Sequence, residues 1–155
     1  ESGVLGCLGY IDASHEIVYY REPTRRHTIN SEFSKISINS LPNVEIVYSY
    51  AGANGNLIRY IAESNQYHGI VIAGTGAGRF SKDEEDALRS AVEKGMHVVR
   101  SSRVGNGRVI DIEPYRTLQA ISGDNLNPQK ARILLLVSLL VHSDREAIQN
   151  VFHHY

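Results

Sequence analysis

A glycine-rich loop in the middle of the chain has the residue types of a phosphate-binding site. The apolar run GIVI (69–72) is followed by AGTGAGRF (73–80), which carries Gly74, Gly76 and Gly78. A loop of this kind between a strand and a helix commonly cradles phosphate with its backbone N–H groups. The loop therefore raises a nucleotide-binding hypothesis, and the spacing of its glycines tests that hypothesis.

The spacing departs from that of the known phosphate loops. A dinucleotide fingerprint has glycine at relative positions one, three and six, but the sixth position here is Arg79 and the third glycine comes early, at Gly78. A Walker-type loop ends in Gly-Lys-Ser/Thr, which AGTGAGRF does not contain. Acidic residues open the segment that follows, and they would repel a phosphate. The pattern disfavours nucleotide binding and favours a tight turn with positive φ.

Thr75 carries the only hydroxyl of the run AGTGAGRF and is a nucleophile candidate if a base lies beside it. The nearest base in the sequence is Lys82, in the first turn of an expected helix, where lysines are usually solvated. The favoured alternative is a loop residue whose hydroxyl satisfies backbone groups. The seven histidines show no metal-ligand spacing, and the single cysteine, Cys7, excludes an intrachain disulfide. We expect no metal site.

The composition is that of an ordinary soluble globular domain. The 155 residues are 42% hydrophobic and 21% charged, with a net charge of −1, which is enough for one domain with a real core. This balance gives no sign of a nucleic-acid or membrane partner, and ILLLVSLLV (133–141) is too short for a membrane helix. The basic cluster REPTRRH (21–27) fits a solvated or interface-facing loop. The opening ESGVLG, with no initiator Met, suggests that residues are missing upstream.

The elements that must position the loop alternate between strand and helix. Apolar runs at 44–50, 69–74 and 96–102 predict strands buried on both faces, and 54–65 and 81–95 predict the helices between them. This order, with short connections, predicts a parallel sheet with right-handed crossovers. Ligands gather beyond the carboxyl ends of such strands, which is where the glycine-rich loop would lie.

Capping residues mark three expected helix starts. A side chain that accepts a hydrogen bond from a free N–H group stabilises the first turn of a helix, and proline suits the first helical position. The caps are Ser81 with Glu84 for the helix 81–95, Asn127 before Pro128 for a helix at 127–142, and Ser143 with Glu146 for a helix at 143–155.

The residues before the predicted sheet do not show the alternation of strands and helices. The stretch 3–21 is rich in β-forming residues around a polar turn and predicts a hairpin, while 22–43 predicts an extended connection that packs along a surface or crosses between layers. We therefore expect an α/β fold: a small parallel sheet of about four strands flanked by helices, preceded by an N-terminal β-hairpin and a long connecting segment. The hairpin and connection occupy 1–43, and the α/β domain occupies 44–155.

Six segments, in order, resemble the bacterial-type L-asparaginases, including the glutaminase-asparaginases. RSSRV and LNPQKAR are the most specific of the motifs within them, and the resemblance covers nearly the whole chain. The segments are RRHTINSEF (25–33), LPNVEIVYSYAGA (41–53), GIVIAGTGAG (69–78), VVRSSRVGNGRV (98–109), DNLNPQKARILL (124–135) and IQNVFHHY (148–155).

The resemblance implies an amidohydrolase whose catalytic residues lie elsewhere. Family members have two domains, and the N-terminal one carries two catalytic threonines in motifs resembling TGGT and DGTDT, with an aspartate and a lysine as partners. This chain has neither motif; its threonines are Thr24, Thr28, Thr75 and Thr117. The chain thus resembles the C-terminal domain, with no catalytic residue and no expected activity by itself. The complete enzyme would hydrolyse the side-chain amide of asparagine through an acyl-enzyme, without cofactor or metal, with glutamine left open.

The resemblance also assigns a role to the glycine-rich loop. In the family this loop reaches into the active site of a neighbouring subunit and holds the substrate's α-amino end through an asparagine in a pattern like G-N-G-N. Here Ala77 and Arg79 stand at the two asparagine positions. Arg79 cannot accept a hydrogen bond, so it would instead bind a carboxylate. Glu113 is the nearest match, shifted by one residue, to a family glutamate near the substrate's amino group; its alternative is an exposed loop carboxylate.

The remaining expectations concern partners and alternatives. Gly74, Thr75, Gly76 and Gly78 would shape the site, while Arg79 and Glu113 would bind substrate in a neighbouring subunit. The implied partners are an N-terminal asparaginase domain or chain, a small amino-acid substrate and further copies in a homotetramer. A cytoplasmic and an exported location both remain open. The alternatives are a non-catalytic assembly or small-ligand-binding module and, with less support, a nucleotide-binding domain.

Overall fold

The apolar runs of the second half of the chain form one parallel sheet. The structure, a computed structural model, describes residues 6–155. Strands β3 (Val44–Tyr48), β4 (Gly69–Gly74), β5 (His97–Ser102) and β6 (Ile121–Ser122) lie side by side in that order, and every neighbouring pair is parallel. This confirms the prediction of a small parallel sheet of about four strands.

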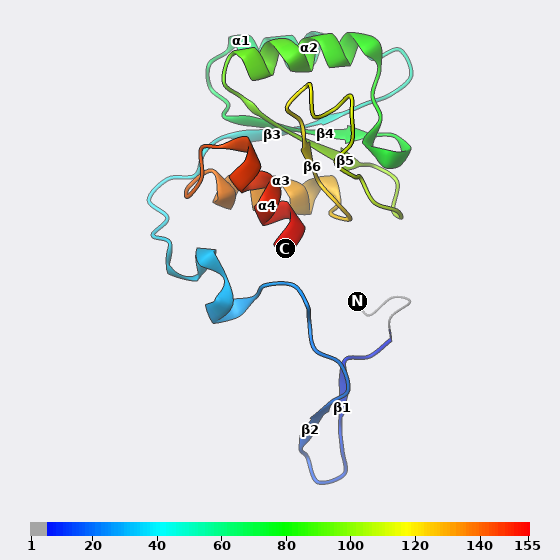
Figure 1. The fold of residues 1–155 in the computed structure, drawn as a ribbon, viewed down its shortest axis with the longest axis vertical. Helices are drawn as coiled ribbons and strands as arrows, with labels where there is room; N and C mark the ends of the chain where they lie inside the picture. The colour runs from blue at the N-terminus through cyan, green and yellow to red at the C-terminus, as the bar shows by residue number, and fades with distance from the viewer. Residues whose placement is uncertain (1–5) are drawn as a thin grey trace.

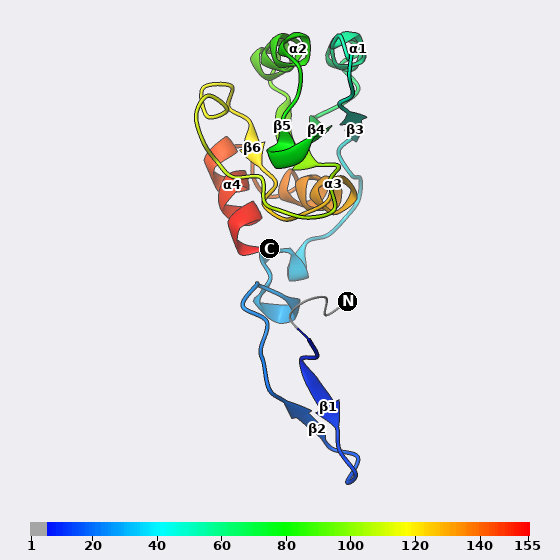
Figure 2. The same ribbon diagram turned by 90° about the vertical axis from the view of Figure 1, so that its right-hand side faces the viewer.

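Two helices cover each face of the sheet. Figure 2 shows α1 (Asn56–Glu63) and α2 (Lys82–Glu93) on one side, with α3 (Pro128–Ser138) and α4 (Arg145–His154) on the other. The buried apolar residues form two clusters accordingly, one between the sheet and each helix pair. All six residues of β4 are buried because this strand lies between β3 and β5 and has a helix layer on both faces. This three-layer arrangement is the expected α/β fold.

Helix α1 buries a narrower stripe than its sequence suggests. Ile58, Ile61 and Ala62 are buried against the sheet, but the apolar side chain of Leu57 in the same helix is 57% exposed. A residue one position before Ile58 is rotated by about 100° around the helix. Leu57 therefore lies at the side of the buried stripe and faces solvent.

Strand β6 is the element that the sequence did not locate. It has only two residues, and Ser122 is held from outside the sheet by a helix side chain. Its backbone N–H donates to Oε1 of Gln149 in α4 at 2.7 Å, and its carbonyl accepts from Nε2 of the same amide at 3.3 Å. The strand thus depends on a residue far along the chain.

The helix starts follow their caps, with one correction. Ser81 and Glu84 form the predicted capping box, and Asn127 accepts a hydrogen bond from the Lys130 N–H at 2.9 Å. The predicted Ser143 and Glu146 box is wrong. Helix α4 starts one residue later, because the carboxylate of Asp144 accepts from the N–H of Ala147 at 2.8 Å and of Glu146 at 3.3 Å.

Asn127→Ala is expected to lower the free energy of unfolding by about 0.5–2 kcal/mol, because the first turn of α3 loses the oxygen that accepts the Lys130 N–H. Chemical denaturation of both proteins measures the difference. Asn127→Ser, which keeps a capping oxygen, is the control and should recover most of the loss. Equal stability of Asn127→Ala and wild type would contradict the capping role.

The N-terminal hairpin stands apart from the sheet. β1 (Gly9–Ile11) and β2 (Ile17–Tyr19) pair in antiparallel fashion, as predicted; residues 3–5 of the expected hairpin lie outside the described residues. Figures 1 and 2 show the hairpin projecting well away from the α/β body. Its apolar side chains are exposed on both faces: Leu8, Tyr10, Ile11, Ile17, Tyr19 and Tyr20.

The connecting segment is fastened to the end of the chain. It contains two short 3₁₀ turns, η2 (Thr28–Asn30) and η3 (Glu32–Lys35). The Tyr155 hydroxyl donates to Oγ of Ser31 at 2.8 Å, and the Arg26 N–H donates to the carbonyl of His154 at 3.0 Å. The connection is therefore held against the carboxyl end of α4.

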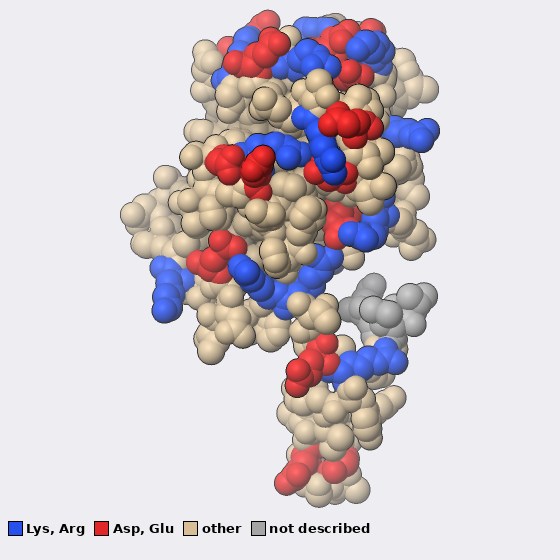
Figure 3. All heavy atoms as spheres, in the orientation of Figure 1, with Lys and Arg blue, Asp and Glu red and all other residues tan. Residues whose placement is uncertain are grey.

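The surface shows no single-sign field on the face seen in Figure 3, where acidic and basic side chains interleave over the α/β body. This agrees with the net charge of −1. Within residues 6–155, every helix is too short or too polar to cross a lipid bilayer.

Candidate functional site

The glycine-rich loop forms a closed turn at the carboxyl end of β4. The Thr75 N–H donates to the carbonyl of Arg79 at 2.8 Å, and the Gly78 N–H donates to the carbonyl of Thr75 at 2.9 Å. Between them lies the single 3₁₀ turn η4 (Gly76–Gly78). The loop is thus a compact unit that turns the chain from β4 toward α2.

The three glycines of this loop have different reasons to be there. A Cβ on Gly74 would lie 2.5 Å from the Arg79 carbonyl oxygen, so the loop can close in this way only because residue 74 has no side chain. Gly78 has a φ of +68° and faces Val109, while Gly76 has open space around it. Ala77, with a φ of 59°, takes the left-handed conformation instead of Gly76. The prediction of a tight turn with positive φ therefore holds for Gly78.

The amino end of α2 is already capped by side chains and is unfavourable for binding a phosphate. Oε2 of the buried Glu84 accepts hydrogen bonds from the Ser81 N–H at 2.9 Å and the Ser49 hydroxyl at 2.7 Å, and Oγ of Ser81 accepts from the Glu84 N–H at 3.1 Å. A carboxylate thus stands where an anion would bind, and its negative charge would repel a phosphate.

Thr75 has no activating base in its neighbour Lys82. The Lys82 ammonium pairs with Asp86 at 3.1 Å and with Glu85 at 3.3 Å, and these hydrogen bonds raise its pKa above the ordinary value. The hydroxyl of Thr75 donates to the Arg79 carbonyl at 3.3 Å. The alternative of a loop residue that satisfies backbone groups accounts for Thr75.

Arg79 and Glu113 are both exposed and lie on two different segments. Arg79 follows the carboxyl end of β4, whereas Glu113 lies on the segment that returns from β5 to β6. Arg79 closes the glycine-rich loop through its backbone carbonyl, and its side chain is turned to solvent. Glu113 accepts hydrogen bonds through Oε2 from the hydroxyl of Thr117 at 2.7 Å and from its N–H at 3.3 Å. This bond orients the Glu113 carboxylate on its own loop.

Arg100 brings these two loops together. It lies inside β5, paired in register with Ile72 and Ser122, and is 1% exposed. Its guanidinium donates from Nη2 to the carbonyl of Ala77 at 2.9 Å and from Nη1 to the carbonyl of Ile110 at 3.3 Å. One buried side chain therefore touches both the glycine-rich loop and the segment that carries Glu113.

The sequence predicts a strand at 96–102 but does not locate this junction. The available signal was a charged residue between apolar and small residues in VVRSS, because a charge inside a buried strand needs partners. Burial lowers the pKa of Arg100 to about 10, against the opposing effects of Tyr115 and Asp111. The guanidinium therefore stays charged at neutral pH.

A second buried charge lies where the segment after β5 returns to the sheet. Asp124 is 4% exposed and binds the guanidinium of Arg25 at 2.7 Å as well as that of Arg108. Burial acts to raise the pKa of Asp124, but the two arginines hold it below the ordinary value. The carboxylate clamps the connecting segment, the loop after β5 and the end of β6 together.

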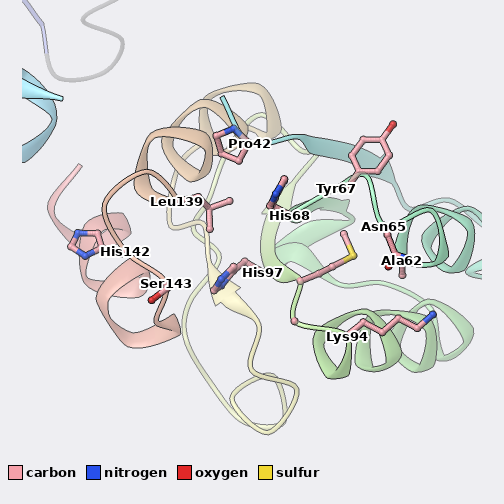
Figure 4. Close-up of a pocket in the computed structure, with 12 residues that line it drawn as sticks. Pro42, Ala62, Asn65, Tyr67, His68, Lys94, His97, Leu139, His142 and Ser143 are labelled. Carbon is pink, nitrogen blue, oxygen red and sulfur yellow. The ribbon is translucent and has the colours of Figure 1, made fainter. Parts of the chain in front are cut away.

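A cavity of about 360 Å³ lies at the other edge of the sheet, where β4 and β5 begin (Figure 4). It lies where α1, α2 and α3 end, and its lining includes His68, Lys94, His97 and His142. Nδ1 of His68 accepts from the Asn43 N–H at 3.2 Å, and Nε2 of His142 lies 2.8 Å from Oε2 of Glu32. His68 and His142 therefore have structural partners.

Metal ligands do not gather in the part of the chain that the structure describes. Among residues 6–155, no three histidine, cysteine, aspartate or glutamate side chains lie close enough to hold a metal ion. The burial of His97 lowers its pKa, against the opposing charge of Asp144. The candidate site consists of the glycine-rich loop, the segment that carries Glu113, and Arg100, which donates hydrogen bonds to both.

The sequence and the fold both match known proteins. A sequence model of the Glutaminase/Asparaginase C-terminal domain family matches residues 43–152. L-asparaginase 2 of Escherichia coli (strain K12) is 39% identical over 155 residues, 97% of this chain and 43% of that protein. L-asparaginase 2 of Bacillus subtilis (strain 168) is 38% identical over 149 residues, 96% of this chain and 40% of that protein.

A solved structure agrees with these matches. The crystal structure of a probable cytoplasmic L-asparaginase from Campylobacter jejuni superposes with a TM-score of 0.83 at 39% identity, covering 96% of this chain and 47% of that one. The chain thus spans less than half the length of the proteins it matches.

Proposed function

Because this chain belongs to the glutaminase/asparaginase C-terminal domain family, we propose that it is the C-terminal part of an L-asparaginase-like amidohydrolase that converts asparagine to aspartate and ammonia. The observation that carries the proposal is the family match over residues 43–152. In addition, 96–97% of this chain aligns with part of two L-asparaginases. The nucleophile lies upstream of this chain, in the partner N-terminal asparaginase domain, so the chain by itself is inactive.

The hairpin supports such a partner. An isolated two-stranded hairpin is marginally stable in water, yet this one exposes apolar side chains on both faces, including Tyr10, Ile11 and Tyr19. Packing against an upstream domain would bury them. We place the hairpin and the interdomain connection at 1–43 and the C-terminal domain at 44–155, assembled with further copies into a tetramer.

In this assembly the two loops bind the non-reacting end of the substrate in a neighbouring subunit. The guanidinium of Arg79 is exposed and can hold the substrate's α-carboxylate through a charge-assisted hydrogen bond. The carboxylate of Glu113, oriented by Thr117, can accept a hydrogen bond from the α-ammonium. Gly74, Thr75, Gly76 and Gly78 shape the loop that presents Arg79.

Ammonia release from L-asparagine by the full-length protein tests the proposed function. We expect release that saturates with asparagine, and no release from residues 1–155 by themselves. Full-length protein that is folded, tetrameric and inactive on both asparagine and glutamine would contradict the proposal. It would favour the alternative of a non-catalytic assembly or ligand-binding module.

Arg79→Asn is expected to change KM for asparagine about tenfold and to leave kcat within about twofold. The residue binds the end of the substrate that does not react, and loss of uniform binding appears in KM. Steady-state kinetics of the full-length protein measure both constants. Arg89→Asn, which alters a half-buried arginine paired with Glu85 on α2, is the control. Unchanged KM in Arg79→Asn would remove Arg79 from the site.

A further inference from the structure

The guanidinium of Arg100 donates hydrogen bonds to two loops. Its Nη2 and Nε face the carbonyls of Ala77 and Gly78, at 2.9 and 3.5 Å, in the glycine-rich loop. Its Nη1 faces the carbonyl of Ile110, at 3.3 Å, in the segment after β5. An arginine is suited to this arrangement because its donors leave a rigid plane in fixed directions.

Aromatic rings extend the same junction. The Arg100 Cζ lies 3.4 Å from the centroid of the Tyr115 ring, which is a cation–π contact. Phe80, at the end of the glycine-rich loop, makes an edge-type contact with the Tyr115 ring at a centroid distance of 5.4 Å. Phe80 and Tyr115 therefore join the two loops a second time, over the guanidinium.

The buried charge of Arg100 makes a movement of either loop costly in free energy. Asp111, a carboxylate whose charge acts on Arg100, is itself paired with Arg116 and Arg145. The buried guanidinium therefore depends on loop carbonyls and on the Tyr115 ring. A shift of either loop would leave donors of a buried cation without acceptors, which is costly in free energy. Each loop thus keeps its position only while the other keeps its own.

We propose that Arg100 is a positioning residue that couples the glycine-rich loop to the segment 110–115, and so fixes Arg79 relative to Glu113. This inference rests on the proposed function for its kinetic consequence, because Arg79 and Glu113 are the two groups assigned to the substrate. Arg100 itself is buried beneath the loops and acts only through them.

Arg100→Lys in the full-length protein tests the coupling. Lysine keeps the charge but loses the planar set of donors, so it cannot satisfy both loops. We expect KM for asparagine to rise about tenfold, with kcat per folded protein within about twofold. The matched control is Arg132→Lys, which alters a half-buried arginine that donates to the Val44 carbonyl at 2.7 Å, far from both loops. It should change stability without changing KM.

Amide hydrogen exchange gives a readout that does not depend on catalysis. In Arg100→Lys, the protected N–H groups of Gly78, bonded to Thr75, and of Tyr115, bonded to Ile112 at 3.0 Å, should exchange faster by the same factor. Should Arg100→Lys fail to fold, Tyr115→Leu removes the ring while Arg100 stays, and it should speed exchange at Gly78.

The outcomes separate the two proposals. Exchange that accelerates in one loop only, or a lower kcat with unchanged KM, would overturn the coupling and leave Arg100 with a purely structural role. A wild-type protein without ammonia release would contradict the proposed function. In that case, joint acceleration at Gly78 and Tyr115 would still support the coupling.

Discussion

A variant in which Arg25 and Arg108 are both methionine is expected to lose about 3–5 kcal/mol of unfolding free energy, the cost of leaving a buried charge without its partners. Asp124 is 4% exposed, so its carboxylate cannot turn to solvent when the guanidinium groups are removed. The loss would loosen the connecting segment, the loop after β5 and the end of β6 together. Denaturant unfolding followed by circular dichroism measures it.

Two single variants serve as controls for this clamp. Asp124→Asn should lose less, about 2 kcal/mol, because the arginines that remain are exposed over 39% and 66% of their side chains and can be solvated. Asp86→Asn, in an exposed pair with Lys82, should lose at most about 1 kcal/mol. If the double variant were as stable as Asp86→Asn, the clamp would have no role in stability.

The stabilisation by this clamp depends on pH in a defined direction. The pKa of Asp124 in the folded protein lies below the ordinary value of 3.8, so its contribution is present above about pH 4 and is lost as the pH falls toward the folded pKa. Without the arginines, burial would raise the pKa of Asp124, and the variant would lose stability as the pH rises through that value. The difference between the two proteins should therefore be largest at neutral pH and shrink below pH 4.

Gly74→Ala should destabilise the glycine-rich loop by about 1–3 kcal/mol, as expected for an atom forced into a packed site. The added Cβ would lie 2.5 Å from the Arg79 carbonyl and 2.6 Å from the Gly78 carbonyl carbon, both of them backbone atoms that cannot rotate away. The closing hydrogen bond from Thr75 to Arg79 would have to open. Thermal and denaturant unfolding measure the loss of stability.

The loop provides its own control in Gly76→Ala. Gly76 has open space at its Cβ position and no positive φ, so alanine should be neutral or stabilise the protein by up to about 1 kcal/mol through the unfolded chain. Equal losses for Gly74→Ala and Gly76→Ala would mean that the loop is not closed as the structure shows.

Much of the fold could be predicted because local signals and packing agree. The runs around 44, 69 and 96 form strands as predicted, and β4 is buried on both faces, but the edge strand β3 is only partly buried and exposes Tyr48. Ser81 and Asn127 lie where the helices begin. Strand β6 escaped prediction because two residues give no periodicity. The start of α4 was misplaced because Ser143 and Asp144 are both capping residues, and only the geometry shows which one accepts the bonds.

The site could be predicted only in part, for a different reason. The glycine-rich loop is recognisable in the sequence from its composition, and its position beyond a parallel strand follows from the predicted topology. The role of Arg100 does not, because its partners are backbone carbonyls of Ala77, Gly78 and Ile110. Carbonyls are present at every residue, so only the loop conformations show which of them meet the guanidinium.

The amide of Gln149 has a consequence for how the sheet ends. An outermost strand normally offers unpaired N–H and C=O groups to any passing extended chain, and such groups invite strand addition and aggregation. Beside Ser122, one primary amide supplies both the acceptor and the donor that a further strand would bring. A helix side chain thus takes the place of a neighbouring β-strand at one residue. At Ser122 the backbone groups are therefore not available for pairing with a further strand.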